Sequence, residues 1–231
     1  MRPSTLINSG IFQIIKGNRY FLLPFIVLLL VSTVLVTIQG NSAIFLFVNR
    51  HYSVFADFWF LSFTKLGDGT VAFLLIFILM WVSIREAFTL LVITLLITIL
   101  IALLKRFFFA DYDRPLLYFG EQFIRMVPGY NPPKLHTFPS GHSATAFSVY
   151  LYLTFLVKQR GIKFGLFLVA CTIGYSRVYI SAHFPADVIA GSLSAVLITL
   201  PSYFYCKRIK ASWIDRRITF NVNKVFTRQT A

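Results

Sequence analysis

Six apolar stretches constrain the fold of this chain more than any other feature of its sequence. They fall at about 21–38, 70–84, 88–104, 143–157, 164–180 and 187–206. Each is long enough, or nearly so, to cross a bilayer as a helix. A spanning backbone must satisfy its hydrogen bonds internally, as a helix does. The sequence therefore predicts an all-α integral membrane bundle of six transmembrane helices.

The overall composition fits a chain embedded in a bilayer. Of its 231 residues, 57% are hydrophobic and 13% are charged, and the mean hydropathy is +0.74. A soluble core of this length could not bury so many apolar side chains. We find no internal repeat, low-complexity run or linker, so we expect residues 1–231 to form a single membrane domain. The first stretch is longer than a signal-peptide core, which predicts an uncleaved anchor.

The basic residues predict the orientation of the bundle. The formal net charge is +14. Most Lys and Arg lie in segments that six crossings place on one side, namely 1–20, 85–86, 158–163 and 207–231. The positive-inside rule assigns this side, with both termini, to the cytoplasm. We therefore expect a protein of the bacterial cytoplasmic (inner) membrane, with the loops at 39–69, 105–142 and 177–186 on the outer face.

The basic tail at 207–231 could bind nucleic acid or anionic lipid headgroups. It abuts an apolar span and contains no recognisable nucleic-acid module. Anionic lipid headgroups are therefore the expected partner, and we expect no nucleic acid to bind. The basic residues of the tail are Lys207, Arg208, Lys210, Arg216, Arg217, Lys224 and Arg228.

Ionisable residues gather in three clusters, and all three fall on the predicted outer side. The clusters lie at 105–115, 139–142 and 176–187. In the middle cluster, Ser140 is a natural helix N-cap and Gly141 lets a ligand approach the backbone. Free amides at such a helix start bind anions. An ordinary capped helix would also explain these two residues, but it gives no reason for His142.

The last cluster pairs a histidine with a carboxylate. Pro185 suits the first position of a helix, which places Asp187 at the third position, able to reach back toward His183. A carboxylate there can fix the imidazole tautomer and leave the other ring nitrogen as a nucleophile. The alternative is that Asp187 only caps the helix while His183 anchors an interface.

Three cations share the predicted outer side with both histidines. Arg114 and Arg177 offer guanidinium forks that suit phosphate oxygens, and Lys105 adds a point charge. Two histidines and an aspartate are also plausible zinc ligands. Three cations around one carboxylate would repel a divalent metal, however, and would stabilise a phosphoryl group in transfer. The sequence therefore predicts phosphate chemistry with no metal and no cofactor.

These residues match a known family pattern. The string Pro-Ser-Gly-His at 139–142 and the pattern Ser-Arg-x5-His-x3-Asp at 176–187 resemble two signatures of the type 2 phosphatidic acid phosphatase superfamily. Lys105 with Arg114-Pro115 resembles the remaining signature, which usually has six residues between its Lys and Arg-Pro. Here eight residues separate Lys105 from Arg114 and seven separate Arg106 from Arg114. Either Lys105 or Arg106 could therefore be the basic residue of this signature. A bulged loop at 110–113 would absorb the insertion.

The resemblance implies a six-helix membrane enzyme with a histidine nucleophile. His183 would attack phosphorus, Asp187 would orient it, and His142 would protonate the leaving oxygen and later deprotonate water. The resemblance further implies a phosphohistidine intermediate that needs no cofactor. The phosphoryl group would be bound by Lys105, Arg114, Arg177, Ser140 and Gly141.

The expected substrate is a membrane lipid, because the outer loop at 107–138 is rich in aromatic residues suited to the interface. Phosphatidic acid, phosphatidylglycerol phosphate, a polyprenyl diphosphate and a lipid A type saccharide all remain open. Two other functions are also open. The superfamily includes vanadate-dependent haloperoxidases, and intramembrane basic residues also mark non-catalytic lipid transporters or scaffolds.

Overall fold

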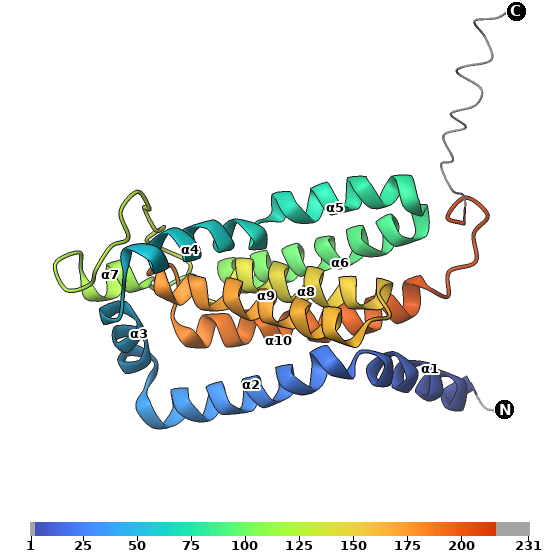
Figure 1. Cartoon of the computed structure of the whole chain (residues 1–231), viewed down its shortest axis with the longest axis horizontal. Helices are drawn as coiled ribbons and strands as arrows, with labels where there is room; N and C mark the ends of the chain where they lie inside the picture. Colours follow the sequence, from blue (N-terminus) through green and yellow to red (C-terminus); the bar gives the residue numbers. More distant parts are fainter. Residues whose placement is uncertain (1–2, 216–231) are drawn as a thin grey trace, which may run out of the picture.

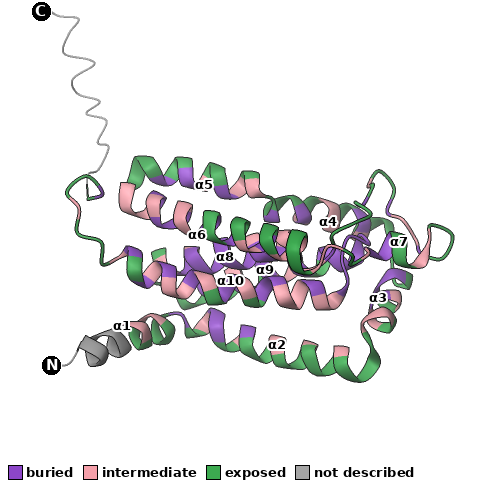
Figure 2. Ribbon diagram, turned by 180° about the vertical axis from the view of Figure 1, so that it is seen from behind, coloured by how far each residue is buried: buried purple, intermediate pink, exposed green. Residues whose placement is uncertain are grey.

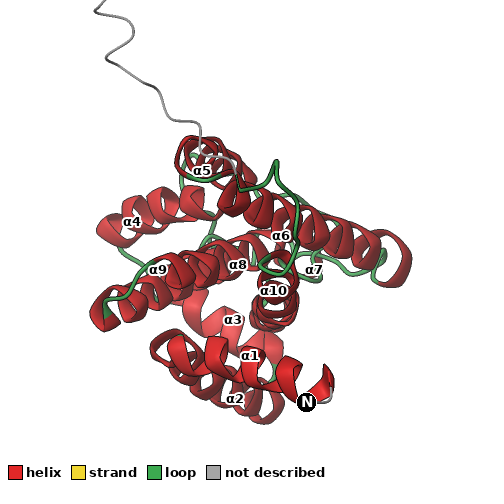
Figure 3. Ribbon diagram, turned by 90° about the vertical axis from the view of Figure 1, so that its right-hand side faces the viewer, coloured by secondary structure: helices red, strands yellow, loops and turns green. Residues whose placement is uncertain are grey.

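The computed structural model describes residues 3–215, with side chains from residue 10 onward. Among these residues the regular structure is helical and contains no strand (Figure 3). The predicted all-α class is therefore confirmed. The α-helices are α1 (Pro3–Gly17), α2 (Arg19–Gln39), α3 (Asn41–Arg50), α4 (Val54–Thr64), α5 (Gly69–Val82), α6 (Ile84–Leu103), α7 (Pro115–Phe119), α8 (Gly141–Leu156), α9 (Arg160–Tyr179) and α10 (Pro185–Cys206).

Length and composition identify four to five candidate membrane spans within residues 3–215. Four are single helices: α2, α6 with its π-helical extension (Ile84–Phe108), α9 and α10. A fifth forms if α4 and α5, which are bent by 51° at their junction, count as one broken span. The remaining predicted span, 143–157, falls on α8, which has 16 residues. That length is below the roughly 20 residues that a 30 Å hydrocarbon core requires of an untilted helix.

The tight connection expected at 85–86 is present two residues earlier, and residues 85–86 themselves lie in the first turn of α6. Ser83 alone separates the two helices and is the N-cap of α6, where its hydroxyl accepts a 3.4 Å hydrogen bond from the backbone N–H of Glu86. The carboxylate of Glu86 accepts from the Tyr152 hydroxyl at 2.9 Å and pairs with Lys207. Arg85 pairs with Asp215, so both charged residues of the predicted hairpin, Arg85 and Glu86, have partners.

The segment at 39–69 is more regular than the outer loop that the hydropathy suggested. It contains α3 and α4, and a short 3₁₀ turn (Lys65–Gly67) joins α4 to α5. Helix α4 is apolar, with Val54, Phe55 and Phe58 exposed. Its 11 residues are too few to span a bilayer, which is why hydropathy alone did not reveal it.

Helix α8 lies at the centre of the bundle, packed against α6, α9 and α10 (Figures 1 and 2). Most of its side chains are buried. A close approach brings its start against α10, because a Cβ added at Gly191 would lie 2.4 Å from the carbonyl oxygen of Ser140. The backbone N–H of Ser140 donates to the carbonyl of Asp187 at 2.9 Å. Glycine at 191 thus lets two segments of predicted site residues touch.

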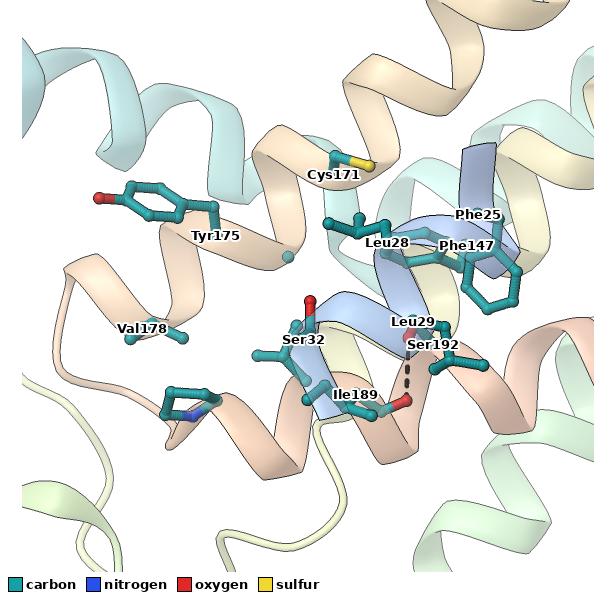
Figure 4. A pocket seen from close by; sticks show the side chains of 13 residues that line it. Phe25, Leu28, Leu29, Ser32, Phe147, Cys171, Tyr175, Val178, Ile189 and Ser192 are labelled. Atoms are coloured by element: carbon teal, nitrogen blue, oxygen red, sulfur yellow. Dashed lines mark hydrogen bonds between the residues drawn. The ribbon is translucent and has the colours of Figure 1, made fainter. Parts of the chain in front are cut away.

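An apolar cleft of about 290 Å³ separates α2 from α9 and α10 (Figure 4). Phe25, Leu28, Tyr175 and Ile189 are among its lining residues. The predicted catalytic and phosphate-binding residues do not line this cleft. The candidate site therefore lies elsewhere, at the end of the bundle that carries α3 and α7 (Figure 1).

Candidate active site

The predicted site residues meet where several helices begin or end. Arg114 directly precedes α7, Arg177 lies in the last turn of α9, and His183 lies in the turn that leads into α10. The remaining members are Lys105 in the π-helical segment Leu104–Phe108, Ser140, Gly141 and His142 at the start of α8, and Asp187 in the first turn of α10.

The turn between α9 and α10 holds His183 against the end of α9. The backbone N–H groups of Ala182 and His183 both donate to the carbonyl of Arg177, at 3.0 and 3.1 Å. Ser181 reverses the chain with a φ of 59°, in the left-handed region. The imidazole of His183 is 2% exposed. The nitrogen atoms of its ring must therefore be satisfied by the protein or by a ligand.

Asp187 makes both of the contacts that the sequence left as alternatives. Its Oδ2 accepts from the backbone N–H of Phe184 at 2.9 Å, which caps α10, and it lies 3.2 Å from Nδ1 of His183. The carboxylate is buried. Capping the helix and contacting the imidazole are thus properties of one oxygen.

Thr137 is a third partner of that oxygen, and the sequence analysis missed it. Its hydroxyl donates to Oδ2 of Asp187 and lies 3.3 Å from Nδ1 of His183. The side chain is 2% exposed. The sequence shows a hydroxyl residue two positions before Pro139, close to the cluster at 139–142. Nothing in the residue spacing indicated that its partner would be Asp187.

Arg114 lies on the opposite side of the imidazole. Its Nη1 is 3.4 Å from Nε2 of His183 and donates to the carbonyl of Ala182 at 3.0 Å, while its Nε donates to the carbonyl of Leu135 at 2.8 Å. These partners are neutral, so they hold the guanidinium without cancelling its charge. Burial and the nearby charge of Arg177 lower the pKa of Arg114, which nevertheless stays charged.

Arg177 is held in the same manner by neutral groups. It donates from Nη1 to the Thr64 hydroxyl at 2.6 Å and from Nη2 to the Tyr130 hydroxyl at 3.3 Å. Its buried Nε has no hydrogen-bond partner among the described residues. Thr64 and Tyr130 lie far from Arg177 in the sequence, and no local pattern could have indicated them.

Lys105 and Arg106 differ in exposure and in surroundings. Lys105 is half-buried, and its charge acts on His183, Asp187 and Arg114, whereas Arg106 is exposed. A π-helix has more residues per turn than an α-helix. After Phe108 the chain leaves this π-helix and reaches Arg114 through a turn and irregular residues, where a bulged loop at 110–113 was predicted.

At the start of α8, both the hydroxyl and the backbone N–H of Ser140 form hydrogen bonds within the protein. Its hydroxyl accepts from the backbone N–H and from the hydroxyl of Ser143, at 3.4 and 2.9 Å, and its own backbone N–H is bonded to Asp187. The sequence-predicted cap is thus present.

His142 lies in the first turn of α8. The nearby charges that act on its imidazole are Arg177, Asp68, Arg114 and Lys105.

The electrostatics of the site favour a neutral His183. Burial, reinforced by the positive charges of Arg114, Arg177 and Lys105, holds the pKa of the imidazole well below its usual range. An arginine only donates hydrogen bonds and a carboxylate only accepts them. The neutral ring therefore carries its proton on Nδ1, toward Asp187, and its lone pair on Nε2, toward Arg114.

The donor set of the site suits an anion. Within residues 3–215, no three His, Cys, Asp or Glu side chains are grouped so that they could share a metal ion. The Arg114 guanidinium lies 3.4 Å from Nε2 of His183, and the positive charges of Arg177 and Lys105 also act on this imidazole. Such an array matches the oxygens of a phosphoryl group.

Comparison with known proteins identifies the family. The family model of the PAP2 superfamily matches residues 86–210, more than half of the chain. The chain belongs to the PAP2 superfamily. The resemblance proposed from the three signatures is therefore confirmed, as is the predicted enzyme class of a PAP2-type phosphatase.

Two solved structures share this fold. The crystal structure of Aquifex aeolicus LpxE superposes with a TM-score of 0.63 and 32% identity, covering 71% of this chain and 94% of that one. The crystal structure of a transmembrane PAP2 type phosphatidylglycerolphosphate phosphatase from Bacillus subtilis gives a TM-score of 0.59 and 21% identity, covering 84% and 99% of the two chains. The second comparison shows the fold alone.

A curated relative adds a local match. The lipid A 4'-phosphatase of Bacteroides thetaiotaomicron is 36% identical over 56 residues, which are 24% of this chain. The match spans a quarter of the length of that relative. The apolar helices and the membrane PAP2 structures together support an integral membrane protein.

Replacing Thr137 with Val should lower kcat roughly 10- to 100-fold, because the buried Asp187 loses a hydrogen-bond donor and bonds to charged groups contribute about 1.5–3 kcal/mol. Thr137→Ser should keep most of the activity. Phosphate release from a lipid phosphate in detergent measures both. Thr33→Val is a matched control, since the Thr33 hydroxyl bonds only to the Leu29 carbonyl of its own helix. Wild-type activity in Thr137→Val would contradict the assigned contact.

Proposed function

We propose that this protein is a metal-independent phosphatase that removes a phosphate group from a membrane lipid through a phosphohistidine on His183. The observation that carries the proposal is the placement of one imidazole between opposite charges. Asp187 lies 3.2 Å from Nδ1, and the Arg114 guanidinium lies 3.4 Å from Nε2. The lone pair of a nucleophile thus faces a cation where the phosphoryl group would bind.

In the first step, Nε2 of His183 attacks phosphorus and the bond from phosphorus to the ester oxygen breaks. His142 donates a proton to that leaving oxygen. Asp187 stabilises the positive charge that develops on the imidazole. In the second step, His142 accepts a proton from water, the water oxygen attacks phosphorus, and the phosphorus–nitrogen bond breaks. Inorganic phosphate leaves and His183 is restored.

The cations stabilise the phosphoryl oxygens during both steps. Arg114 and Arg177 are already fixed by neutral partners, so little reorganisation accompanies binding. Of Lys105 and Arg106, we propose that Lys105 binds the phosphoryl group, because Lys105 is half-buried and Arg106 is exposed. Gly141 contributes its backbone N–H at the start of α8, and Ser140 fixes the direction of that helix start.

We place the site at headgroup depth on the outer face of a bacterial inner membrane, with six crossings and both termini in the cytoplasm. The distribution of basic residues supports this orientation. The sixth crossing would be α8, which is short but buried among longer helices. A lipid phosphate at that depth would reach His183 without leaving the bilayer.

The substrate class follows from the same geometry and from the relatives. The names of two of the similar proteins describe phosphatases of lipid A and of phosphatidylglycerolphosphate. Both substrates present a phosphate monoester at the membrane surface. We therefore propose a lipid phosphate monoester as the substrate.

A panel of lipids tests this function. The wild-type protein in detergent should release phosphate from at least one of the monoesters phosphatidic acid, phosphatidylglycerol phosphate and lipid A, and faster than from polyprenyl diphosphate. Release should need no added metal and should persist in the presence of a chelator. His183→Ala should reduce turnover by about 10⁴-fold or more, since loss of a nucleophile removes the covalent route. His51→Ala is the control, because this imidazole is exposed and, among the described residues, contacts Phe47. Chelator-sensitive turnover would contradict the proposal.

The acid limb of the pH dependence of kcat/KM reports the nucleophile. His183 must be neutral to attack, and its lowered pKa keeps it neutral as the pH falls. Activity should therefore persist below pH ~6.5, the ordinary histidine value, and decline only at lower pH. A profile from pH 4 to 8 measures this. Loss of activity with a midpoint at or above the ordinary value would contradict the assignment.

A further inference from the structure

A second basic site lies at the end of the bundle opposite the candidate active site. It is a hollow of about 390 Å³ between the junction of α1 with α2 and the start of α9. We call it the basic hollow. Along α9, Arg160 at the hollow and Arg177 at the active site are separated by about 25 Å of helix rise. The lining residues are Gln13, Lys16, Gly17, Arg19, Tyr20, Lys158, Arg160 and Lys163.

Lys163 places a buried positive charge at the wall of the hollow. The side chain is 7% exposed, and its Nζ donates to the carbonyl of Gly17 at 2.7 Å and to Oδ1 of Asn18 at 2.9 Å. Both acceptors are neutral. A buried charge is costly unless an opposite charge accompanies it. Within residues 3–215 no carboxylate is paired with Lys163.

Two guanidinium groups lie at the same aromatic ring despite their like charge. The Cζ atoms of Arg19 and Arg160 are 5.0 and 5.5 Å from the centroid of Tyr20. An anion between such groups would offset their repulsion and accept their hydrogen bonds. In the described part of the chain, none of the five cations of the hollow forms an ion pair.

A neighbouring basic surface provides a contrast. A second hollow at the same end contains Arg85 and Lys207, but Arg85 pairs with Asp215 at 2.7 Å and Lys207 pairs with Glu86. Carboxylates of the protein therefore already pair with two of the four cations that line it, and Arg208 and Lys210 are the other two. The basic hollow lacks this internal compensation among the described residues.

Two helix starts add to the positive potential. Helix α2 begins at Arg19 and α9 begins at Arg160, and neither N-cap residue, Asn18 or Gln159, makes a side-chain capping hydrogen bond. The N-terminus of a helix carries a partial positive charge and offers free N–H groups to an anion. Because both helices are candidate spans, the hollow lies where a span meets the membrane surface.

We propose that the basic hollow binds the headgroup phosphate of an anionic phospholipid. Basic pockets between transmembrane helices recognise such headgroups. Next to the hollow, the side of α2 that points away from the bundle exposes Leu23, Ile26 and Val27. The acyl chains of the same lipid can cover these side chains. A bound lipid would join the α1–α2 segment to α9 at a point remote from catalysis.

Native mass spectrometry of the full chain tests the proposal with dioleoyl phosphatidylglycerol and dioleoyl phosphatidylcholine, which have the same acyl chains. The wild-type protein should retain the anionic lipid at least tenfold more tightly. Arg160→Gln and Lys158→Gln should each weaken phosphatidylglycerol binding about fivefold, as expected for one interfacial charge. Lys210→Gln removes one charge at the same end of the bundle, outside the basic hollow, and should leave binding unchanged.

The outcomes separate the possible sources of the anion. Equal retention of the two lipids, or equal weakening by Lys210→Gln and Arg160→Gln, would overturn the proposal. Displacement of the lipid by millimolar inorganic phosphate would identify a free anion as the occupant and would also overturn it. Phosphatase activity in detergent should be unchanged in all three variants, which shows that they are folded.

Discussion

One buried carboxylate oxygen connects the fold of this protein to its chemistry. Oδ2 of Asp187 accepts from the Phe184 backbone and from the Thr137 hydroxyl, and it lies 3.2 Å from Nδ1 of His183. A buried anion without such donors would be strongly destabilising. The same contacts start α10, attach the loop before α8 and set the imidazole tautomer. The same oxygen therefore both starts the helix and contacts the imidazole that we propose as the nucleophile.

The cationic side of the site depends on the opposite arrangement. Arg114 and Arg177 are held by carbonyl and hydroxyl groups rather than by carboxylates. Such partners fix the guanidinium groups but leave the positive charge uncompensated. A phosphoryl group would supply the missing charge. The basic hollow at the other end of the bundle repeats this arrangement with Lys163, whose acceptors are also neutral.

The sequence predicted those features that depend on local composition and spacing. Long apolar runs predicted the helices that became α2, α6, α9 and α10, and residue spacing predicted that Asp187 would reach His183. Contacts between distant segments were beyond the reach of such patterns. Thr64, at the end of α4, and Tyr130, in the loop before α8, position Arg177. Helices α3 and α4 are too short for a hydropathy signal. Their positions depend on tertiary packing, which one sequence does not display.

The central claim, that His183 carries the phosphoryl group, is tested most directly by trapping the intermediate. The wild-type protein would be mixed with a lipid labelled with ³²P in its terminal phosphate, quenched within one turnover in alkali, and digested for peptide mapping. The account predicts an alkali-stable, acid-labile label on the peptide that contains His183. Label on another residue, or turnover without any labelled protein, would contradict it.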